Sequence, residues 1–499
     1  MARKITHTLI LEGSLVAQTP LHTGGADTWH TTDMPLAVNG RGEFYLSGTS
    51  IAGAIHAWEQ AEEVNVIWGY AKDKTDEGNA SFIIVDDAPA KDAPIAEIWH
   101  GIGIDRKWGG AANGIKFDRQ ALPQGTRFCF RLQREVGKVE ELEEARKRVG
   151  QLAMALEAGD IPFGGGVTRG FGRLKLEGAT GSETDWSGKA GILSWLADEP
   201  RDDVLAEWRK LGCTSTDKRA RTIEIEIHWQ PQGPLMSKAA RDGMAVDALP
   251  FVSRNRHGKY ALTLPGSGIK GALRQHAERI VRTVLGSDGK ADAEQHFDQV
   301  NVPLVRDLFG AARPADNKDK KPVEAAKGKL AVDTCYAGFA LARNDWDSLD
   351  SSVAAWQGKQ HPLTRADHVA IDRWTGGAAD TALFNAVEPD KSIQWEPIRM
   401  TLDCRRGKPL PELALLWLTL RDFCAGRIPL GFGVNRGYGD LAVNKISLRG
   451  LDALGCEEIS ADLMVTEGRI EENDITKMRD TLKNAWAAWI KSQETGGKQ

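Results

Sequence analysis

The chain contains two stretches in which hydrophobic and polar residues alternate. Residues 222–229 (TIEIEIHW) alternate strictly, which predicts a β-strand with one buried face, and residues 6–13 (THTLILEG) hold the corresponding place nearer the N-terminus. A helix is predicted after each strand, capped by Ser47 or Thr49 in the first case and by Ser267 in the second. The apolar face of the second helix consists of Ile269, Leu273, Ile280 and Val284.

A further helix is predicted before each of two glycine-rich segments. The first of these helices has an apolar face made of Leu142, Ala145, Val149, Leu152 and Leu156, and the second covers residues 413–423. Each half of the chain is therefore predicted to contain, in this order, a strand, a helix, further strands, a long hairpin, a helix and a strand. The simplest fold for this order is an α+β, ferredoxin-like domain with insertions at one edge, present twice in tandem.

An internal repeat supports this division. Residues 104–113 (IDRKWGGAAN) recur as residues 371–380 (IDRWTGGAAD), and residues 158–174 (AGDIPFGGGVTRGFGRL) recur as residues 425–441 (AGRIPLGFGVNRGYGDL). Both pairs are 267 positions apart, which chance does not explain. We expect the following parts: a first domain at 1–178, a connector at 179–219, a second domain at 220–450 with an insertion at about 286–330, and a helical tail at 451–499.

The sequence predicts more about the connector, the insertion and the tail. The connector contains Trp186, Trp195 and Trp208 and is predicted to be partly helical. The insertion contains the Lys-rich segment ADNKDKKPVEAAKGK, which reads as a solvated loop. The tail contains an amphipathic helix around residues 478–490, which we interpret as a docking element.

Composition and charge narrow the possible functions. The 499 residues suffice for two to four domains. Glycine is in excess, since its 53 copies are about 18 more than an average usage of ~7% would give. The net charge of −5 means that a local basic surface, rather than the field of the whole molecule, must hold any nucleic-acid partner.

Cysteine usage and hydropathy exclude other classes. The six cysteines contain no CxxC pair, so the sequence predicts neither a zinc site nor a disulfide framework. The N-terminal run MARKITHTLILEG is too short for a secretory signal, and no segment approaches the ~18 apolar residues of a membrane span. We expect a soluble, cytoplasmic protein without a membrane partner.

The glycine-rich segment IPxGxGVxRG(F/Y)G is the strongest local motif. It lacks the Gly-Lys-Ser/Thr of a phosphate-binding P-loop, and its glycine spacing is not that of a dinucleotide-binding turn. Its glycines allow close approach of the main chain to a partner, Arg169 or Arg436 supplies charge, and Phe171 or Tyr438 supplies a stacking surface. These features favour contact with RNA. The alternative is a glycine-rich hairpin packed against its own sheet.

Each IDRxxGGAA segment predicts a projecting hairpin with glycines at its tip. The tips contain Ile104, Asp105 and Arg106 in the first half and Ile371, Asp372 and Arg373 in the second. An apolar tip of this kind can displace a base from its stack in a duplex. An ordinary exposed hairpin with an Asp–Arg charge pair fits the sequence equally well.

One aspartate follows the first strand of each half, Asp33 in TTDMPLAV and Asp247 in AVDALPFVS. A carboxylate weakens phosphate binding, so its presence in an RNA groove would make sense if it held Mg²⁺ or positioned a 2′-OH for attack. The alternative is an Asx-turn cap ahead of the proline, which is the commoner role of a lone aspartate.

Two cations and one histidine complete the candidate residues. Lys270 and Arg274 lie one turn apart on the predicted helix and could grip phosphates, although Ala52 and His56 replace them in the first half. His22, in PLHTGG, has no counterpart in the second half, and no Ser/His/Asp or Cys/His set is evident.

Together these motifs resemble the RAMP superfamily, and specifically the backbone subunits of type III CRISPR effector complexes. Residues 246–277 (VDALPFVSRNRHGKYALTLPGSGIKGALRQHA) are similar to the Cmr-complex backbone protein. PLHTGG, TTDMPLAV and residues 104–130 are more similar to the Csm-complex one. Two copies in one chain resemble the tandem backbone fusion of type III-D variant complexes.

The resemblance implies a prokaryotic, cytoplasmic RNA-guided endoribonuclease subunit. Its partners would be a CRISPR guide RNA, a complementary target RNA and other effector subunits, namely further backbone subunits, a small subunit and a large signature subunit. Each hairpin, or thumb, would flip a base out of the guide–target duplex. Asp33 and Asp247 would be the catalytic residues and candidate metal ligands for cleavage that depends on Mg²⁺ or Mn²⁺, in which the target's 2′-OH attacks the adjacent phosphate. The implied RNA-binding residues are His22, Arg169, Phe171, Arg254, Lys270, Arg274, Arg436 and Tyr438.

Three other functions remain open from the sequence. The first is a non-catalytic subunit that only holds the guide RNA. The second is a guide-processing nuclease that uses His22 as a general acid or base, which the absence of this histidine from the second half disfavours. The third is a metabolic enzyme unrelated to RNA, which the lack of a small-molecule catalytic set disfavours.

Overall fold

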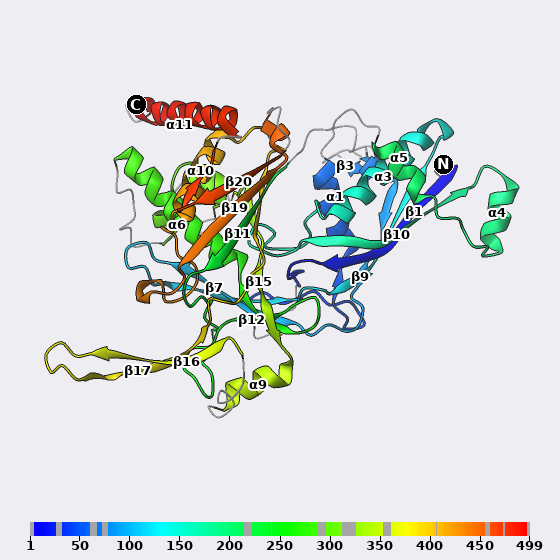
Figure 1. The fold of residues 1–499 in the computed structure, drawn as a ribbon. Coiled ribbons are helices and arrows are strands. Elements are labelled where there is room, and N and C mark those ends of the chain that lie inside the picture. Colours follow the sequence, from blue (N-terminus) through cyan, green and yellow to red (C-terminus); the bar gives the residue numbers. More distant parts are fainter. Residues whose placement is uncertain are drawn as a thin grey trace. The chain divides into compact units, whose positions relative to one another are not determined.

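The computed structural model divides the chain into two compact units (Figure 1). Unit 1 comprises Met1–Trp99, Asp118–Val167 and Phe171–Lys218, and unit 2 comprises His100–Phe117, Thr168–Gly170 and Arg219–Gln499. The structure describes residues 4–25, 32–59, 67–71, 78–213, 222–240, 242–286, 296–311, 326–352, 361–405, 407–454, 460–472 and 475–496.

Unit 1 is built on a four-stranded antiparallel sheet in the order β10-β1-β9-β5. Its elements are β1 (His7–Ala17), β2 (Tyr45–Leu46), α1 (Gly48–Glu59), β3 (Tyr70–Ala71), β4 (Gly78–Asn79), β5 (Ile83–Val85), β6 (Ala88–Pro89), β9 (Arg127–Val136), η1 (Val139–Glu141), α3 (Leu142–Ala158), β10 (Leu174–Asp185), α4 (Lys189–Leu196) and α5 (Leu205–Cys213). The strands β7 (Glu97–Ile104) and β8 (Ala111–Ala121) begin or end in unit 1, but their residues 100–117 belong to unit 2. The predicted apolar face of α3 is buried at all five positions. In α1 the Ser50 N–H donates to Ser47 Oγ at 3.3 Å, which confirms the predicted cap.

Unit 2 contains a six-stranded antiparallel sheet in the order β14-β18-β11-β19-β20-β21. Its elements are β11 (Thr222–Pro231), β12 (Val252–Arg254), β13 (Tyr260–Leu264), α6 (Gly266–Leu285), α7 (His296–Val300), α8 (Val305–Phe309), β14 (Leu330–Val332), β15 (Cys335–Leu341), α9 (Arg343–Ser351), β16 (Leu363–Ile371), β17 (Ala378–Pro389), β18 (Ile398–Asp403), α10 (Leu410–Cys424), η4 (Val434–Arg436), β19 (Leu441–Arg449), η5 (Leu451–Leu454), β20 (Ser460–Thr466), β21 (Arg469–Ile470) and α11 (Thr476–Gly496).

The alternation seen in the sequence is present in the core of unit 2. Every second residue of β11 from Ile223 to Trp229 is buried, as predicted. The predicted cap of α6 is wrong, because the helix follows Pro265 and no side chain caps its N-terminus. Val284 is exposed, whereas the polar residues Lys270 and Glu278 are buried. The structure thus shows a mixed α/β fold with antiparallel sheets in two units.

The predicted connector and the C-terminal tail pack on the units that they follow, whereas the sequence suggested separate parts. In the predicted connector, α5 packs against α3, and Trp208 is fully buried in the core of unit 1. The C-terminal helix α11 packs against α10 of its own unit through Met478 and Leu482. Within the predicted insertion, residues 287–295 and 312–325, including most of the Lys-rich segment, lie outside the described residues. No helix in the described ranges is long and apolar enough to cross a membrane.

Candidate nucleic-acid interface

Two long hairpins correspond to the predicted thumbs. Thumb 1 is formed by β7 and β8, and thumb 2 by β16 and β17. The tips have the same turn, in which the N–H of the tip aspartate, Asp105 or Asp372, donates to the carbonyl oxygen of Gly110 or Gly377 at 2.9 and 2.8 Å. The aspartate Oδ1 also accepts bonds from main-chain N–H groups two and three residues later. Each tip is therefore held by its own aspartate and not by an Asp–Arg pair.

Thumb 2 is exposed along most of its length. Its tip residue Trp374 is 96% exposed, and Leu383 on the returning strand is 70% exposed. Ile371 and Arg373 are exposed as well, and Arg373 has no hydrogen-bond or ion-pair partner in the part of the chain that the structure describes. The sequence prediction of a projecting hairpin fits this thumb.

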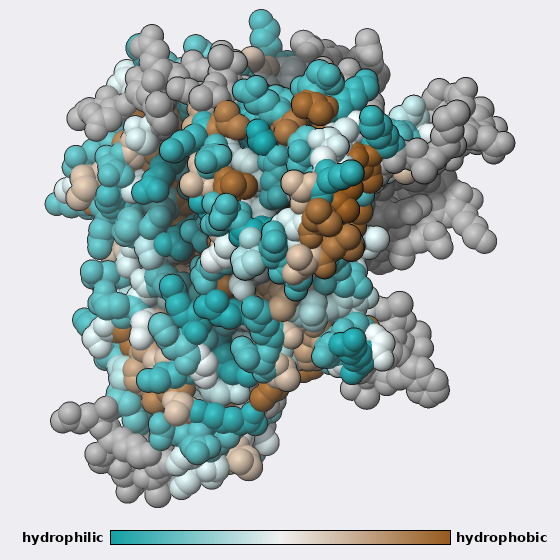
Figure 2. Space-filling model, turned by 90° about the vertical axis from the view of Figure 1, so that its right-hand side faces the viewer, coloured by the Kyte–Doolittle hydropathy of each residue, from teal (hydrophilic) through white to brown (hydrophobic). Residues whose placement is uncertain are grey.

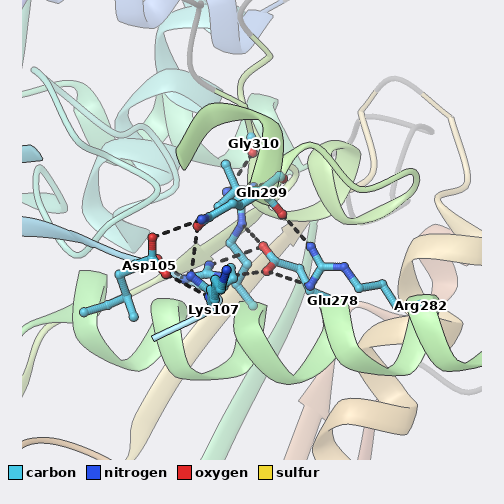
Figure 3. A network of polar contacts seen from close by, with 10 residues as sticks. Asp105, Lys107, Glu278, Arg282, Gln299 and Gly310 are labelled. Carbon is cyan, nitrogen blue, oxygen red and sulfur yellow. Dashed lines mark hydrogen bonds and ion pairs between the residues drawn. The ribbon is translucent and has the colours of Figure 1, made fainter. Parts of the chain in front are cut away.

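The tip of thumb 1 is itself part of unit 2, where it packs on helix α6 (Figure 3). Arg106 Nε donates to Glu278 Oε2 at 2.6 Å, and Glu278 has no exposed surface. The Arg106 N–H donates to Gln299 Oε1 at 2.9 Å, and Gln299 Nε2 donates to Asp105 Oδ2 at 3.0 Å. That bond is the main reason why the pKa of Asp105 is lowered. Asp105 and Arg106 of this tip thus contact the protein, whereas Trp108 is 79% exposed.

The two candidate catalytic aspartates make the same long-range contact. Asp33 Oδ2 accepts the main-chain N–H of Asp118 on thumb 1 at 2.8 Å, and Asp247 Oδ2 accepts that of Asn385 on thumb 2 at 2.8 Å. Asp118 and Asn385 are equivalent in the repeat, since they are 267 positions apart. The residue after each aspartate pairs with the same strand in parallel, through the bridges Met34–Arg119 and Ala248–Ala386. Each carboxylate therefore lies at the base of a thumb.

This geometry differs from an Asx-turn, because each carboxylate binds a residue far along the chain. Both aspartates are exposed, and within the described ranges their Oδ1 atoms accept no hydrogen bond. A free carboxylate oxygen can take one coordination position of a Mg²⁺ or Mn²⁺ ion that is otherwise held by water and phosphate. No group of three or more His, Cys, Asp or Glu residues suited to a metal occurs among the described residues. Each site therefore offers a single free carboxylate oxygen.

The glycine-rich segments pack closely on their own units. A Cβ atom at Gly164 would lie 2.3 Å from the carbonyl oxygen of His22, and one at Gly431 would lie 2.3 Å from that of Met236. Gly172 approaches Phe163 in the same way. Gly164, Gly172 and Gly431 all have positive φ angles, between 73° and 87°. Close packing of the glycine-rich segment on its own unit, which was the alternative to RNA contact, therefore accounts for these glycines.

The aromatic residues of these segments are buried rather than available for stacking on RNA. Phe171 is 7% exposed and packs edge-on against Trp99, with centroids 5.1 Å apart. Tyr438 is 6% exposed, and its hydroxyl hydrogen-bonds with Glu388 and His368. Burial and the Glu388 carboxylate raise the pKa of Tyr438. The geometry corrects the expectation that Phe171 and Tyr438 stack on bases.

The arginines of the same segments remain accessible. Arg169 and Arg436 are both exposed. The Arg436 guanidinium lies 5.0 Å from the ring centre of Phe384 and 4.9 Å from that of Phe432, which fixes its direction through cation–π contacts. These arginines fit the predicted contact with phosphates.

The other predicted RNA-binding residues differ in accessibility. His22 is buried, its Nδ1 lies 2.8 Å from the Gln120 carbonyl oxygen, and burial lowers its pKa. Lys270 is 5% exposed and donates to the Leu330 carbonyl oxygen at 2.6 Å. Arg274 bonds to Glu278 and to two carbonyl oxygens. Arg254 is half-buried on β12. In this structure His22, Lys270 and Arg274 serve internal packing, not a phosphate surface.

Sequence reasoning missed the two tryptophans at the thumb tips. Trp108 and Trp374 are among the most exposed large hydrophobic side chains in the described part of the chain. The available signal was a tryptophan within two residues of a glycine pair in a predicted turn, because a side chain at the tip of a projecting hairpin cannot reach a core. An exposed indole at a hairpin tip is suited to stacking on a base.

A comparison with known proteins agrees with the repeat. The chain matches the model of the RAMP superfamily over residues 14–175 and again over residues 243–442, which together make up most of its length. Each matched region contains one aspartate site, one thumb and one glycine-rich segment. No curated protein matches the chain. On these grounds the chain belongs to the RAMP superfamily.

Proposed function

We propose that this chain is a tandem, guide-RNA-binding backbone subunit of a type III CRISPR effector complex that cleaves target RNA at two sites. RAMP proteins bind RNA and function in CRISPR complexes, and they are often ribonucleases. In both units the first and last strands of the repeat are neighbours, in the orders β10-β1-β9-β5 and β19-β11-β18-β14. That order supports a ferredoxin-like fold for each unit.

The observation that carries the proposal is the repeated attachment of an aspartate to the base of a thumb. This long-range contact is the same in two halves that differ at most other positions. In both cases the distance is 2.8 Å and the aspartate is exposed. A hairpin that opens the duplex next to a carboxylate would bring a distorted phosphodiester to that carboxylate.

The chemistry follows from what one carboxylate can do. A divalent ion bound there supplies charge that stabilises the developing negative charge on the phosphate. The main-chain N–H of Asp118 or Asn385 orients the carboxylate by holding Oδ2, which leaves Oδ1 for the ion or for the 2′-OH. Attack of the target's own 2′-OH would give a cyclic phosphate and a 5′-OH. Arg169, Arg436 and the exposed tip tryptophans would hold the RNA.

The alternative of a non-catalytic, guide-holding subunit has one observation in its favour. Each aspartate already has a structural task, because it satisfies a main-chain N–H of a thumb strand. That task alone would account for an aspartate in both halves.

The deciding experiment replaces both aspartates by asparagine, Asp33→Asn with Asp247→Asn, in the assembled ribonucleoprotein. Asparagine keeps a carbonyl oxygen for the main-chain N–H but removes the charge, so folding and RNA binding should persist. We expect cleavage of complementary RNA in Mg²⁺ or Mn²⁺ to disappear. A matched control is Asp380→Asn, an exposed carboxylate on the thumb 2 strand. Unchanged cleavage in the double variant, or no cleavage by the wild type, would select the non-catalytic alternative.

A further inference from the structure

A histidine and a glutamate form a polar pair at the base of thumb 2, on the yellow hairpin β16–β17 of Figure 1. His368 of β16 and Glu388 of β17 are 3.3 Å apart, measured from Nε2 to Oε1. The Tyr438 hydroxyl donates to Glu388 Oε1 and lies 3.0 Å from His368 Nε2. Because the single proton of this hydroxyl goes to the carboxylate, its oxygen accepts a hydrogen bond from His368 Nε2. The imidazole is thus oriented from two sides.

This arrangement leaves the other ring nitrogen of His368 without a partner. Nδ1 makes no hydrogen bond in the part of the chain that the structure describes, and the side chain is 27% exposed. Since Nε2 keeps its hydrogen, Nδ1 is the atom that takes up or releases a proton. Histidine is the residue type whose charge changes between pH 5 and 8. When protonated, the ring forms an ion pair with Glu388 and offers an N–H group at Nδ1.

His368 also lies close to the arginine that fits phosphate contact in this half. Its ring stacks on Phe384, with 4.9 Å between the ring centres and an angle of 17° between the planes. The Arg436 guanidinium lies 5.0 Å from the centre of the same Phe384 ring. Phe384 precedes Asn385, whose main-chain N–H binds Asp247. A histidine, a guanidinium and the candidate catalytic carboxylate therefore lie around two consecutive residues of β17.

The strand order shows how far His368 is from the candidate catalytic site. β16 pairs with one edge of β17, whereas Ala248, the residue after Asp247, pairs with the other edge through its bridge to Ala386. Neighbouring strands are about 4.8 Å apart, so these two outer segments are roughly 10 Å apart. That span fits contacts with two neighbouring groups of one RNA strand better than joint action on one oxygen. The geometry therefore favours phosphate binding by His368 over proton transfer.

The first half of the chain has no counterpart of this group. The positions equivalent to His368, Glu388 and Tyr438, each 267 residues earlier, are occupied by Gly101, Ala121 and Phe171. A Cβ atom at Gly101 would lie 2.2 Å from Phe117 Cζ, so a side chain there would displace this ring. Arg119 lies over the Phe171 ring instead, and its own equivalent in the second half is Ala386. A permanent cation in the first half thus corresponds to a titratable one in the second.

The other charged groups that adjoin His368 do not titrate near neutral pH. On its own strand, Asp367 forms an ion pair with Arg365 at 3.1 Å. On the glycine-rich segment, Arg436 is a permanent cation, and burial raises the pKa of Tyr438, so that its hydroxyl keeps its proton. Together with Glu388 on β17, these are the groups whose field the His368 ring experiences. The charge of this surface therefore changes with pH through His368.

We propose that His368 binds a phosphate of the target RNA and thereby makes cleavage at the second site, but not at the first, sensitive to pH. With a neutral imidazole the charges of Arg436 and Glu388 cancel, and with a protonated one a net positive charge remains. Since the whole chain has a net charge of −5, such local cations determine where RNA binds. The proposal rests on the proposed function, because it requires RNA at the base of thumb 2.

The first test uses the two cleavage positions as references for each other. The wild-type ribonucleoprotein cleaves one labelled complementary RNA at pH values from about 6 to 8.5 in constant Mg²⁺, and Asp33→Asn and Asp247→Asn assign the positions. An effect of pH on the metal ion or on the attacking 2′-OH acts at both sites and cancels in the ratio of the two rates. We expect the rate at the second site relative to the first to fall by about threefold as the pH rises, which is the effect of one partly exposed ion pair.

Three substitutions separate the charge of His368 from its structural contacts. His368→Gln keeps an N–H donor for Tyr438 but takes up no proton, so the ratio should stay at its high-pH value. His368→Lys has a permanent charge and should keep the ratio near its low-pH value. His228→Gln, at a partly exposed histidine of β11, is the control and should behave like the wild type. A wild-type ratio that does not change with pH, or one that changes equally in His368→Gln, would overturn the proposal.

A binding measurement separates this proposal from that of target cleavage. The dissociation constant of the full-length chain for a short oligouridylate is measured near pH 6 and pH 8.5, at constant salt and without divalent ions. We expect the affinity of the wild type to fall by about threefold relative to that of His368→Gln. If this difference is found while the wild type cleaves neither RNA position, the cleavage proposal fails and the phosphate contact stands. Equal pH dependence of the two proteins would show that His368 does not bind RNA.

Discussion

The bases of the two thumbs agree in their aspartates and differ in almost everything around them. Beside Asp33, the buried Arg119 lies over Phe171 with 5.2 Å between guanidinium and ring centre. Beside Asp247, the position of Arg119 is occupied by Ala386, and Tyr438 bonds to Glu388 and His368 instead. The packing has thus changed between the halves while the carboxylate and its main-chain partner have not. We infer that the constant part is the catalytic one.

The largest expected effect tests the difference between the thumb tips. Arg106→Ala would leave Glu278 buried with fewer partners, and loss of one member of a buried ion pair costs about 3 kcal/mol of stability. Arg373→Ala removes an exposed group and should change stability by less than about 0.5 kcal/mol. Hydrogen exchange over α6 in both variants measures this contrast. Equal protection in the two would mean that Arg106 does not hold thumb 1.

The second prediction compares the stability cost of the same substitution in the two glycine-rich segments. Gly170 and Gly437 are equivalent and both have positive φ angles, of 93° and 82°. A Cβ atom at Gly170 would lie 2.6 Å from Thr334 Oγ1, whereas one at Gly437 would meet nothing within 4 Å. Gly437→Ala should therefore cost about 1 kcal/mol, for the left-handed backbone alone, and Gly170→Ala about 2–3 kcal/mol. Urea denaturation of the two variants gives the comparison, and a larger loss for Gly437→Ala would contradict it.

The stability of the fold should depend on pH because of Lys270 on α6, a residue that α1 lacks. Burial, followed by the charges of Arg169, Arg274 and Lys327, lowers the pKa of Lys270 to about 7. In the unfolded chain this lysine keeps its proton up to about pH 10, so between these values the unfolded state binds more protons than the folded one. Stability should therefore rise with pH over this window by up to ~1.4 kcal/mol per pH unit.

The control for this effect is Lys270→Met, which keeps the volume of the side chain but not its proton, as at the equivalent Ala52. Unfolding of wild type and variant is measured from pH 6.5 to 10. The stability of the wild type relative to Lys270→Met should increase with pH. Parallel curves would show that Lys270 keeps its proton in the folded state.

A further effect concerns Tyr438. Tyr438→Phe makes this position like its counterpart Phe171 and removes the hydroxyl that bonds to Glu388 and His368. The loss of a hydrogen bond to a charged, half-buried partner should cost about 1–2 kcal/mol of stability. Target cleavage should persist at both positions if the constant aspartate, and not this hydroxyl, is the catalytic part. Thermal unfolding and a cleavage assay of the same preparation report both quantities.

Much of this architecture was predictable from the sequence because it depends on local pattern. The alternation at residues 222–229 gave β11, and the glycine pairs between apolar runs gave the thumbs. The repeat also showed that Asp33 and Asp247 are equivalent, since equal spacing survives even where neighbouring residues change. These inferences need only the periods of strands and helices and the turn preferences of glycine.

The rest depends on contacts between distant residues. Arg106 and Glu278 are 172 positions apart, and nothing near either residue indicates the other. Lys270 looks like a phosphate-binding residue at a helix N-terminus, yet it is buried against the Leu330 carbonyl oxygen. Trp208 looked like part of a connector but fills the core of unit 1. A polar or aromatic residue type does not show which surface covers it, so burial of such residues was the part that the sequence could not supply.

The most direct test of the account is the cleavage pattern of one labelled complementary RNA with the two single variants. Wild-type complex should give two cleavage positions, Asp33→Asn should remove one of them, and Asp247→Asn should remove the other, with RNA binding unchanged. Two positions that persist in both variants, or a single position that neither substitution affects, would contradict the claim that these carboxylates mark two cleavage sites.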